Sequence, residues 1–157
     1  MFFKLALRWF AYIMANERIF PEYLELDALN SMSKGCMVDH LGIVFTEIGD
    51  DYLVATMPVD HRTKQPMGLL HGGASVALAE TMGSVGSTVT IDLNKQYAVG
   101  LEINTNHIKS AKDGLVTGVA KPVHLGRSTQ VWGIDIRNDE NQLVAVSRIT
   151  LAILDRK

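Results

Sequence analysis

Cysteine is almost absent from this sequence: Cys36 is the one cysteine among 157 residues. A single thiol cannot form an intrachain disulfide, and it cannot supply the several cysteine ligands of a structural zinc site. The count therefore favours a reducing, cytoplasmic compartment, and we expect no metal centre.

Net charge is also nearly absent. The 15 Lys and Arg residues almost balance the 17 Asp and Glu residues, which leaves a formal charge of −2. Domains devoted to nucleic acids are usually strongly basic, so no nucleic-acid partner is expected. Apolar residues make up 47% of the chain, which is typical of one ordinary globular domain.

Long apolar runs are missing as well. Residues 1–15 are largely apolar, but Lys4 and Arg8 interrupt them. The unbroken stretch over residues 9–15 falls far short of the ~20 residues that a transmembrane helix needs. We therefore expect no membrane span, while weak contact of residues 1–15 with a membrane surface stays open. Residues 1–21 are interpreted as an N-terminal extension, either accessory or the product of a start codon assigned too early, and 22–157 as the domain itself.

The remaining chain has the periodicity of an α+β domain. We expect one buried helix packed against one antiparallel sheet, in the order β-β-α-β-β-β-β. The last four strands are joined by short turns, which predicts a meander. The expected elements are a helix over residues 22–33, strands over 37–47 and 52–59 with a turn at 49–51, a helix within 65–91, and four strands from 99 to 154 with turns at 113–114, 125–128 and 138–141.

The segment over residues 65–91 contains one formally charged side chain, Glu80. Its many small and apolar residues predict a helix that is apolar on nearly all sides and therefore buried. A buried carboxylate without a partner is costly and rare, so Glu80 is a candidate base or nucleophile. The alternatives are a buried ion pair or exposure at the edge of the helix.

His71, Gly72 and Gly73 stand where this helix should begin. Helix N-termini expose unpaired N–H groups, and a glycine lets a substrate carbonyl approach them, as in an oxyanion hole. The plainer alternative is a turn. Glu80 lies nine residues after His71, on roughly the opposite face and about 13 Å along the axis, so both can serve one substrate only if two chains pair with antiparallel helices. Ser84 follows Glu80 by four residues and shares its face.

Positive charge gathers later in the chain. Residues 107–127 include four basic residues and one acidic residue, and this excess of positive charge suits a small ligand that carries phosphate groups. Alternatively, these basic residues form a solvent-exposed edge of the sheet. The sequence contains no glycine-rich motif of the kind that binds nucleotides. The charged residues are Lys109, Lys112, Asp113, Lys121 and Arg127, and Ser110, His124 and Ser128 add hydrogen-bond donors.

Several separated motifs together resemble the hotdog-fold acyl-CoA thioesterases. They are MPVD at 57–60, TKQP at 63–66, GLLHGGAS at 68–75, AE at 79–80, LEIN at 101–104 and KPVHLG at 121–126. The branch includes 1,4-dihydroxy-2-naphthoyl-CoA hydrolases of menaquinone synthesis and glutamate-type 4-hydroxybenzoyl-CoA thioesterases, and the similarity spans residues 24–154.

The resemblance implies a long helix wrapped by a curved sheet, a dimer or dimer of dimers, and active sites at the dimer interface. It implies hydrolysis of an aromatic acyl-CoA, with coenzyme A as part of the substrate and no cofactor. Glu80 would be the nucleophile or general base, the Gly72 amide would polarise the thioester carbonyl, Gln65 and His71 would assist, and Ser84 would place water or Glu80. The end of the helix and the loop after it would shape the acyl pocket. Coenzyme A would contact His107, Lys109, Ser110, His124, Gly126, Arg127 and Ser128.

Two other functions stay open from the residues. A hotdog 3-hydroxyacyl-CoA dehydratase would also pair a histidine with a carboxylate, although at a different spacing. A non-catalytic acyl-CoA binding module would bind the ester without cleaving it.

Overall fold

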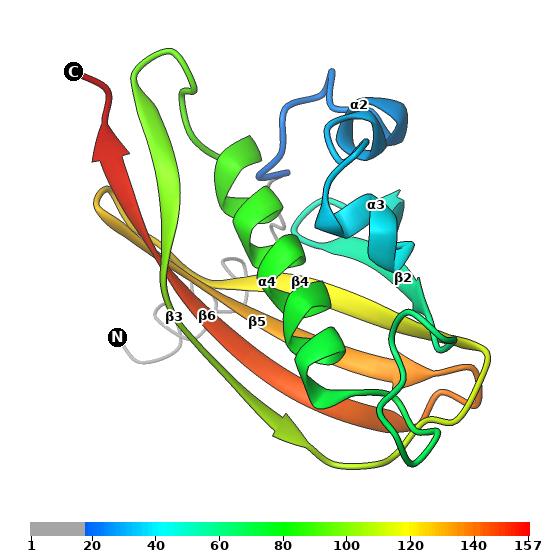
Figure 1. Ribbon diagram of the computed structural model, residues 1–157. Helices are drawn as coiled ribbons and strands as arrows, with labels where there is room; N and C mark the ends of the chain where they lie inside the picture. The colour runs from blue at the N-terminus through cyan, green and yellow to red at the C-terminus, as the bar shows by residue number, and fades with distance from the viewer. Residues whose placement is uncertain (1–17) are drawn as a thin grey trace, which may run out of the picture.

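A computed structural model describes residues 18–157, so most of the expected N-terminal extension lies outside the described residues. One long helix crosses a six-stranded antiparallel sheet (Figure 1), which confirms the α+β hotdog class. The elements are α2 (Leu26–Ser31), α3 (Met37–Leu41), β1 (Val44–Ile48), β2 (Leu53–Pro58), α4 (Gly72–Val89), β3 (Gln96–His107), β4 (Leu115–Leu125), β5 (Thr129–Asn138) and β6 (Leu143–Asp155).

The strands lie in the order β1-β2-β4-β5-β6-β3. The predicted meander is confirmed for β4, β5 and β6, but it is wrong for β3, which pairs with β6 instead of β4. The connection over residues 108–114 passes the start of α4, where Leu70 donates its N–H to the carbonyl of Ala111 at 2.8 Å. A longer connection of this kind can reach a distant strand, whereas a tight hairpin cannot.

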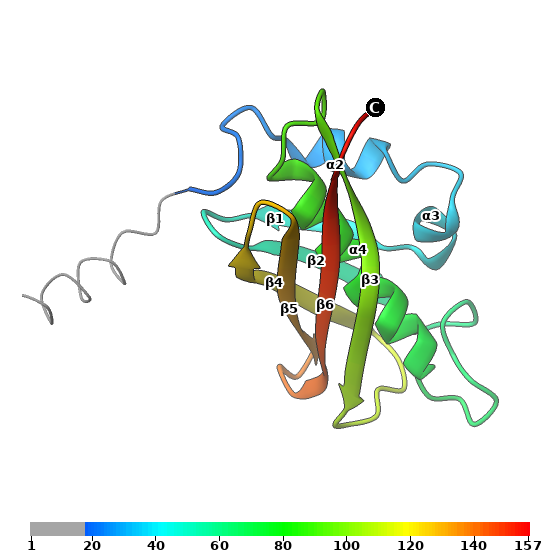
Figure 2. The same ribbon diagram turned by 90° about the vertical axis from the view of Figure 1, so that its left-hand side faces the viewer.

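Strand β3 therefore forms one edge of the sheet, beside β6 (Figure 2). Its outer edge pairs with no strand of residues 18–157. Tyr97, Val99 and Leu101 are exposed along it, and Leu101 reaches 64%. An open edge with apolar side chains is a template for pairing with another strand.

The core lies between α4 and the sheet. Leu78 and Met82 of the helix are fully buried, together with alternate residues of the inner strands. In one chain the sheet covers one side of α4 and α3 contacts part of another side, while the remaining helix surface is only partly buried. The expectation of burial on nearly all sides is therefore wrong for one copy. Its small residues do allow close approach, with Gly83 against Ile149 and Gly86 against Trp132, but the neighbours are side chains.

The segment before β1 differs from its prediction. The expected strand over residues 37–47 is wrong in its first half, because Met37–Leu41 forms the short helix α3. Val38 and Leu41 pack against the core at helical spacing, and Gly42 ends the helix in the left-handed conformation at φ 70°. The expected helix over residues 22–33 is shorter, as α2.

The other strands follow the sequence pattern closely. Strand β2 and the turns before β4, β5 and β6 lie where they were expected. Upstream of α2, Phe20 is buried and its ring stacks on Trp132 at 6.3 Å between centroids. Among residues 18–157, no helix is both long and apolar enough to cross a bilayer.

Candidate active site

A buried threonine holds the loop before α4 in place through hydrogen bonds. Thr63 is 1% exposed, and its hydroxyl donates to the Pro58 carbonyl at 2.6 Å. Its own carbonyl accepts the N–H of His71 at 2.8 Å. Asp60 and Arg62 form an ion pair at 2.7 Å in the same loop. These contacts fix where the helix begins.

His71 is the N-cap of α4. Its Nδ1 accepts the N–H of Gly73 at 2.8 Å. In a neutral imidazole the proton then sits on Nε2, which leaves an outward-facing donor on this exposed side chain. No group of residues 18–157 accepts the Gly72 N–H. The N–H groups of Gly73, Ala74 and Ser75 all donate to His71, so the start of the helix presents one free backbone donor, the Gly72 N–H, with a partial positive charge.

The imidazole of His107 lies over the same glycine. A Cβ at position 72 would stand 2.7 Å from Nε2 of His107, so a larger residue there would displace this imidazole. A cavity of about 330 Å³ opens here between the loop, the helix start and the end of β3. Five of the residues that line it were predicted from the sequence as site residues: Gln65, Gly72, His107, Lys109 and Ser110. The structure thus brings these five predicted residues together in one copy of the chain.

Glu80 lies on the face of α4 that points away from this cavity. Its carboxylate approaches β3, where a Cβ on Gly100 would stand 2.7 Å from Oε1. Strand β3 shifts register between Gly100 and Glu102, a bulge of the type that recurs next to active sites. Glu80 is partly buried, so the expectation of full burial is wrong for one copy. The ion pairs among residues 18–157 use other carboxylates, so the ion-pair alternative is excluded there.

A second cavity, of about 400 Å³, lies beside Glu80. We call it the Glu80 cavity. One wall is α4, and the other is the segment that connects α2 to α3. The cavity is lined by Met32, Ser33, Cys36, Val38, Glu80, Thr81, Ser84, Val85 and Thr88.

The remaining predicted residues lie at the opposite end of the sheet. His124, Gly126, Arg127 and Ser128 belong to the β4–β5 hairpin, which is next to the start of β3, while His107 is at its end. At ~3.3 Å per residue, a strand of this length separates the two ends by roughly 36 Å. The basic cluster inferred from charge is therefore not one surface in a single copy.

One basic residue of that cluster, Lys121, already interacts with an acidic residue and an aromatic ring of the same chain. Lys121 lies 3.5 Å from the Asp51 carboxylate, and its Nζ stands 5.2 Å from the centre of the Tyr52 ring. These contacts hold β4 to the β1–β2 turn. Lys121 thus interacts with the surface of the sheet itself.

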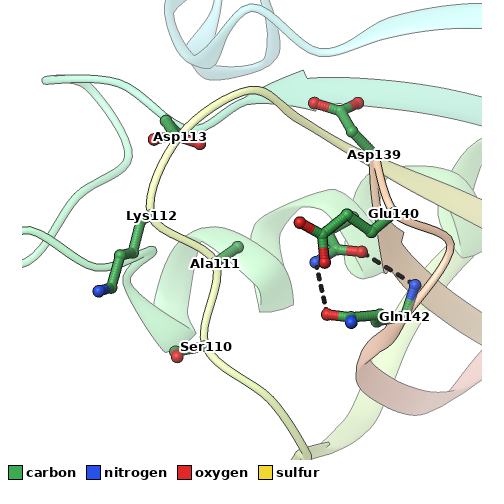
Figure 3. A pocket seen from close by; sticks show the side chains of 8 residues that line it. Ser110, Ala111, Lys112, Asp113, Asp139, Glu140 and Gln142 are labelled. Carbon is green, nitrogen blue, oxygen red and sulfur yellow. Dashed lines mark hydrogen bonds between the residues drawn. The ribbon is translucent and has the colours of Figure 1, made fainter.

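A third cavity, of about 260 Å³, lies between the β3–β4 connection and the β5–β6 turn (Figure 3). Three of its polar side chains form hydrogen bonds within the turns: Asn138 and Gln142 exchange hydrogen bonds, and Asp139 accepts the N–H of Leu115 at 3.0 Å. Within residues 18–157 no group of acidic, histidine or cysteine side chains is arranged to hold a metal ion. We interpret these contacts as turn stabilisation.

Sequence reasoning missed two parts of the site. Gly100 gives the Glu80 carboxylate its space, and a glycine inside a strand is a signal of close approach that could have identified it. Asp60 and Arg62 hold the loop that carries Gln65 and His71. The Arg62 N–H also donates to Asp60 Oδ1 at 2.9 Å, which closes a local turn.

Comparisons with known proteins identify related sequences and structures. The sequence profile of the Thioesterase superfamily matches residues 67–145. A 1,4-dihydroxy-2-naphthoyl-CoA hydrolase of Escherichia coli is 55% identical over 136 residues, which cover 87% of this chain and 99% of that protein. The proofreading thioesterase EntH of Cronobacter sakazakii is 51% identical over 136 residues, covering 87% and 98%. A crystal structure of a mutant of thioesterase PA1618 from Pseudomonas aeruginosa superposes with a TM-score of 0.86 at 43% identity, covering 88% of this chain and 99% of that one.

Proposed function

Because this chain belongs to the thioesterase superfamily and is a thioester hydrolase, we propose that it cleaves an aromatic acyl-CoA to the free acid and coenzyme A. The observation that carries the proposal is the pairing of two features on one helix. The free Gly72 N–H stands at its start, and the partly buried Glu80 carboxylate, without an ion-pair partner in residues 18–157, opens into a cavity halfway along.

The proposal requires two copies of the chain. Gly72 and Glu80 face different cavities of one copy, so neither copy alone surrounds one thioester. The exposed edge of β3 supplies a surface for pairing. Two β3 strands that pair antiparallel bring the end of one strand beside the start of the other. His107, Lys109 and Ser110 of one copy then approach the β4–β5 hairpin of the second, which joins the two halves of the coenzyme A site.

The chemistry follows from the charges that develop in the reaction. The thioester carbonyl accepts the Gly72 N–H, and the helix N-terminus stabilises the negative charge that grows on its oxygen. As a general base, Glu80 of the second copy takes a proton from water while the water oxygen bonds to the acyl carbon. The C–S bond then breaks, and the departing sulfur takes a proton. His71 Nε2–H and the Gln65 amide assist at the thioester.

Glu80 has a second role that the same position supports. As a nucleophile it would form an anhydride with the acyl group and release coenzyme A, and water would then hydrolyse the anhydride. Ser84, one turn further along α4, would place the water in either route. Single-turnover hydrolysis in H₂¹⁸O identifies an anhydride that water opens at the carboxyl carbon of Glu80, because ¹⁸O then enters the Glu80 side chain, whereas the general-base route places it in the acid product.

The aromatic substrate is supported by the E. coli relative, which is named for 1,4-dihydroxy-2-naphthoyl-CoA. We propose the same class of acyl group here, and with it a place in menaquinone synthesis. The test is a panel of hydroxynaphthoyl-, benzoyl-, phenylacetyl- and straight-chain acyl-CoA esters, with free thiol measured as a function of ester concentration. The highest kcat/KM is expected for an aromatic ester. A higher value for straight-chain esters would refute the aromatic assignment, and hydration of an enoyl-CoA without thiol release would indicate a dehydratase.

A further inference from the structure

We propose that residues 32–38, which connect α2 to α3 and include the first two residues of α3, form the outer wall of the acyl site and select which acyl groups are hydrolysed. We call this segment the acyl wall. The inference rests on the proposed function, because it concerns the acyl half of the same substrate. It places specificity on residues outside the catalytic helix.

The position of the Glu80 cavity carries the first step. Its lining on α4 runs from Glu80 to Thr88, eight residues or about 12 Å along the axis. A thioester held with its carbonyl at Glu80 would extend its acyl group along this cavity. The volume of about 400 Å³ lies within the roughly 300–1,000 Å³ of small-molecule sites.

The second step is the chemistry of the lining. Met32 is 61% exposed and faces this opening beside Val38 and Val85. A methionine adapts its shape to flat or irregular apolar groups. Glu80 is the one charged residue among those lining the cavity. An uncharged apolar acyl group is therefore favoured, while an acyl group with its own carboxylate would meet Glu80 with no cation to pair it.

The third step is that the acyl wall is held in place from both sides. Asn30 of α2 exchanges hydrogen bonds with the backbone of Phe45, at 3.0 and 2.8 Å. Beyond the wall, Ile43 donates its N–H to the Val38 carbonyl at 3.0 Å. The wall is thereby anchored to β1, so its side chains define the width of the cavity.

The end of α4 takes part in the Glu80 cavity through Val85 and Thr88, and the acyl wall adds a second side that the family resemblance did not name. That resemblance placed the acyl pocket at the end of the long helix and in the loop after it. None of residues 90–95 lines the Glu80 cavity. In this chain the side chains opposite α4 come from the acyl wall.

Cys36 provides a direct test, because it is the one thiol of the chain and is exposed at this wall. N-ethylmaleimide adds its ring to the sulfur: the thiolate bonds to one alkene carbon and the other carbon takes a proton. The folded enzyme is modified to completion, as judged by intact mass. Values of kcat/KM are then measured for hydroxynaphthoyl-CoA and acetyl-CoA, and affinities for a thioether analogue of the naphthoyl ester and for coenzyme A alone.

We expect kcat/KM for hydroxynaphthoyl-CoA to fall at least tenfold, while the value for acetyl-CoA changes less than twofold. The thioether analogue should lose affinity by a similar factor, and coenzyme A should not. For Cys36→Ser, treatment with the reagent should leave both kcat/KM values as they are in the untreated Cys36→Ser protein, because no thiol remains to react. A Cys36→Ser, Glu140→Cys protein is the matched control, since Glu140 is exposed on the distant β5–β6 turn. Met32→Trp should narrow the cavity without any reagent. It should lower kcat/KM for hydroxynaphthoyl-CoA and leave the value for acetyl-CoA nearly unchanged.

Equal loss on both esters, or no loss after complete modification, would overturn the acyl wall. If the unmodified protein hydrolyses no ester, the proposed function fails. The affinities of the thioether analogue and of coenzyme A still decide the role of the wall in that case, because they do not require turnover.

Discussion

At the scale of single residues, two glycines and one carboxylate define the candidate site. Gly72 makes room for His107 over a free backbone N–H, and Gly100 makes room for the carboxylate of Glu80. A glycine can be recognised in the sequence, but the side chain that packs against it belongs to a different element of the fold. Residue substitutions here should change turnover more than stability.

Glu80→Gln keeps the size of the side chain and removes its basicity. General acid–base groups typically contribute ~10²–10⁴-fold in rate, so kcat should fall by at least about 10²-fold. Steady-state hydrolysis measures the loss, and circular dichroism shows that the fold persists. Glu140→Gln, which changes an exposed carboxyl that lines neither the cavity at Gly72 nor the Glu80 cavity, is the control and should behave as the parent. Near-parental kcat in Glu80→Gln would remove this residue from the mechanism.

Gly100→Ala should push the Glu80 carboxylate from its position, because the added Cβ would stand 2.7 Å from Oε1. Misplacement of a catalytic group by about 1 Å can cost up to about 10²-fold, and we expect a loss of roughly 10- to 100-fold in kcat. Gly133→Ala is a matched control on β5, since its Cβ would meet Val123 at an ordinary 3.4 Å. If both variants retain full activity, the carboxylate is not used where the structure places it.

At the scale of elements, the loop before α4 sets the position of the catalytic helix start. The Asp60–Arg62 pair and the buried Thr63 connect β2 to His71 through a chain of short hydrogen bonds. Side-chain hydrogen bonds from Arg62, joined by its backbone N–H, hold the pKa of the Asp60 carboxyl well below its usual value. The loop is therefore sensitive to pH in a defined direction.

Asp60→Asn should lower Tm at pH 7. A carboxyl whose folded pKa is depressed stabilises the fold above its unfolded pKa, near 3.9, and loses that contribution as pH falls toward the folded value. The Tm difference between parent and variant should be constant from pH 7 to about pH 5 and should shrink below about pH 4. Thermal unfolding across this range measures it. A Tm difference that grows on acidification would contradict the assigned sign.

At the scale of the whole molecule, the open edge of β3 explains why one chain carries only part of a site. The residues expected to bind coenzyme A lie at opposite ends of the sheet, and the two ends of one β3 strand cannot approach each other. Antiparallel pairing of two copies resolves this separation by symmetry. The proposed site is thus a property of the pair.

Mixing two inactive chains tests this sharing. Glu80→Gln and His71→Ala proteins should each be nearly inactive, while a mixture should recover up to about a quarter of parental activity. Random reassortment of two chains gives half mixed dimers, and each of these has one intact site of two. Subunit exchange is verified by native mass spectrometry of differently tagged chains. Proven exchange without any recovery would show that each chain works alone.

Local features of this protein were readable from sequence because they depend on neighbours along the chain. The start of α4 at His71, the strands of the meander and the turns before them follow from periodicity and from glycine, asparagine and proline chemistry. Glu80 stands out because it is the one charge in a long apolar segment. The prediction failed for residues 37–41, where packing of Val38 and Leu41 against the core outweighs their strand propensity.

Only the tertiary structure decided which distant residues meet. The pairing of β3 with β6, the space that Gly100 leaves for Glu80 and the separation of His107 from His124 depend on long-range contacts that no local pattern encodes. The sequence by itself determined the chemical groups and their spacing on one helix. The fold determined that the residues expected to bind coenzyme A lie at opposite ends of one copy, because a sheet with a long edge strand keeps its ends apart.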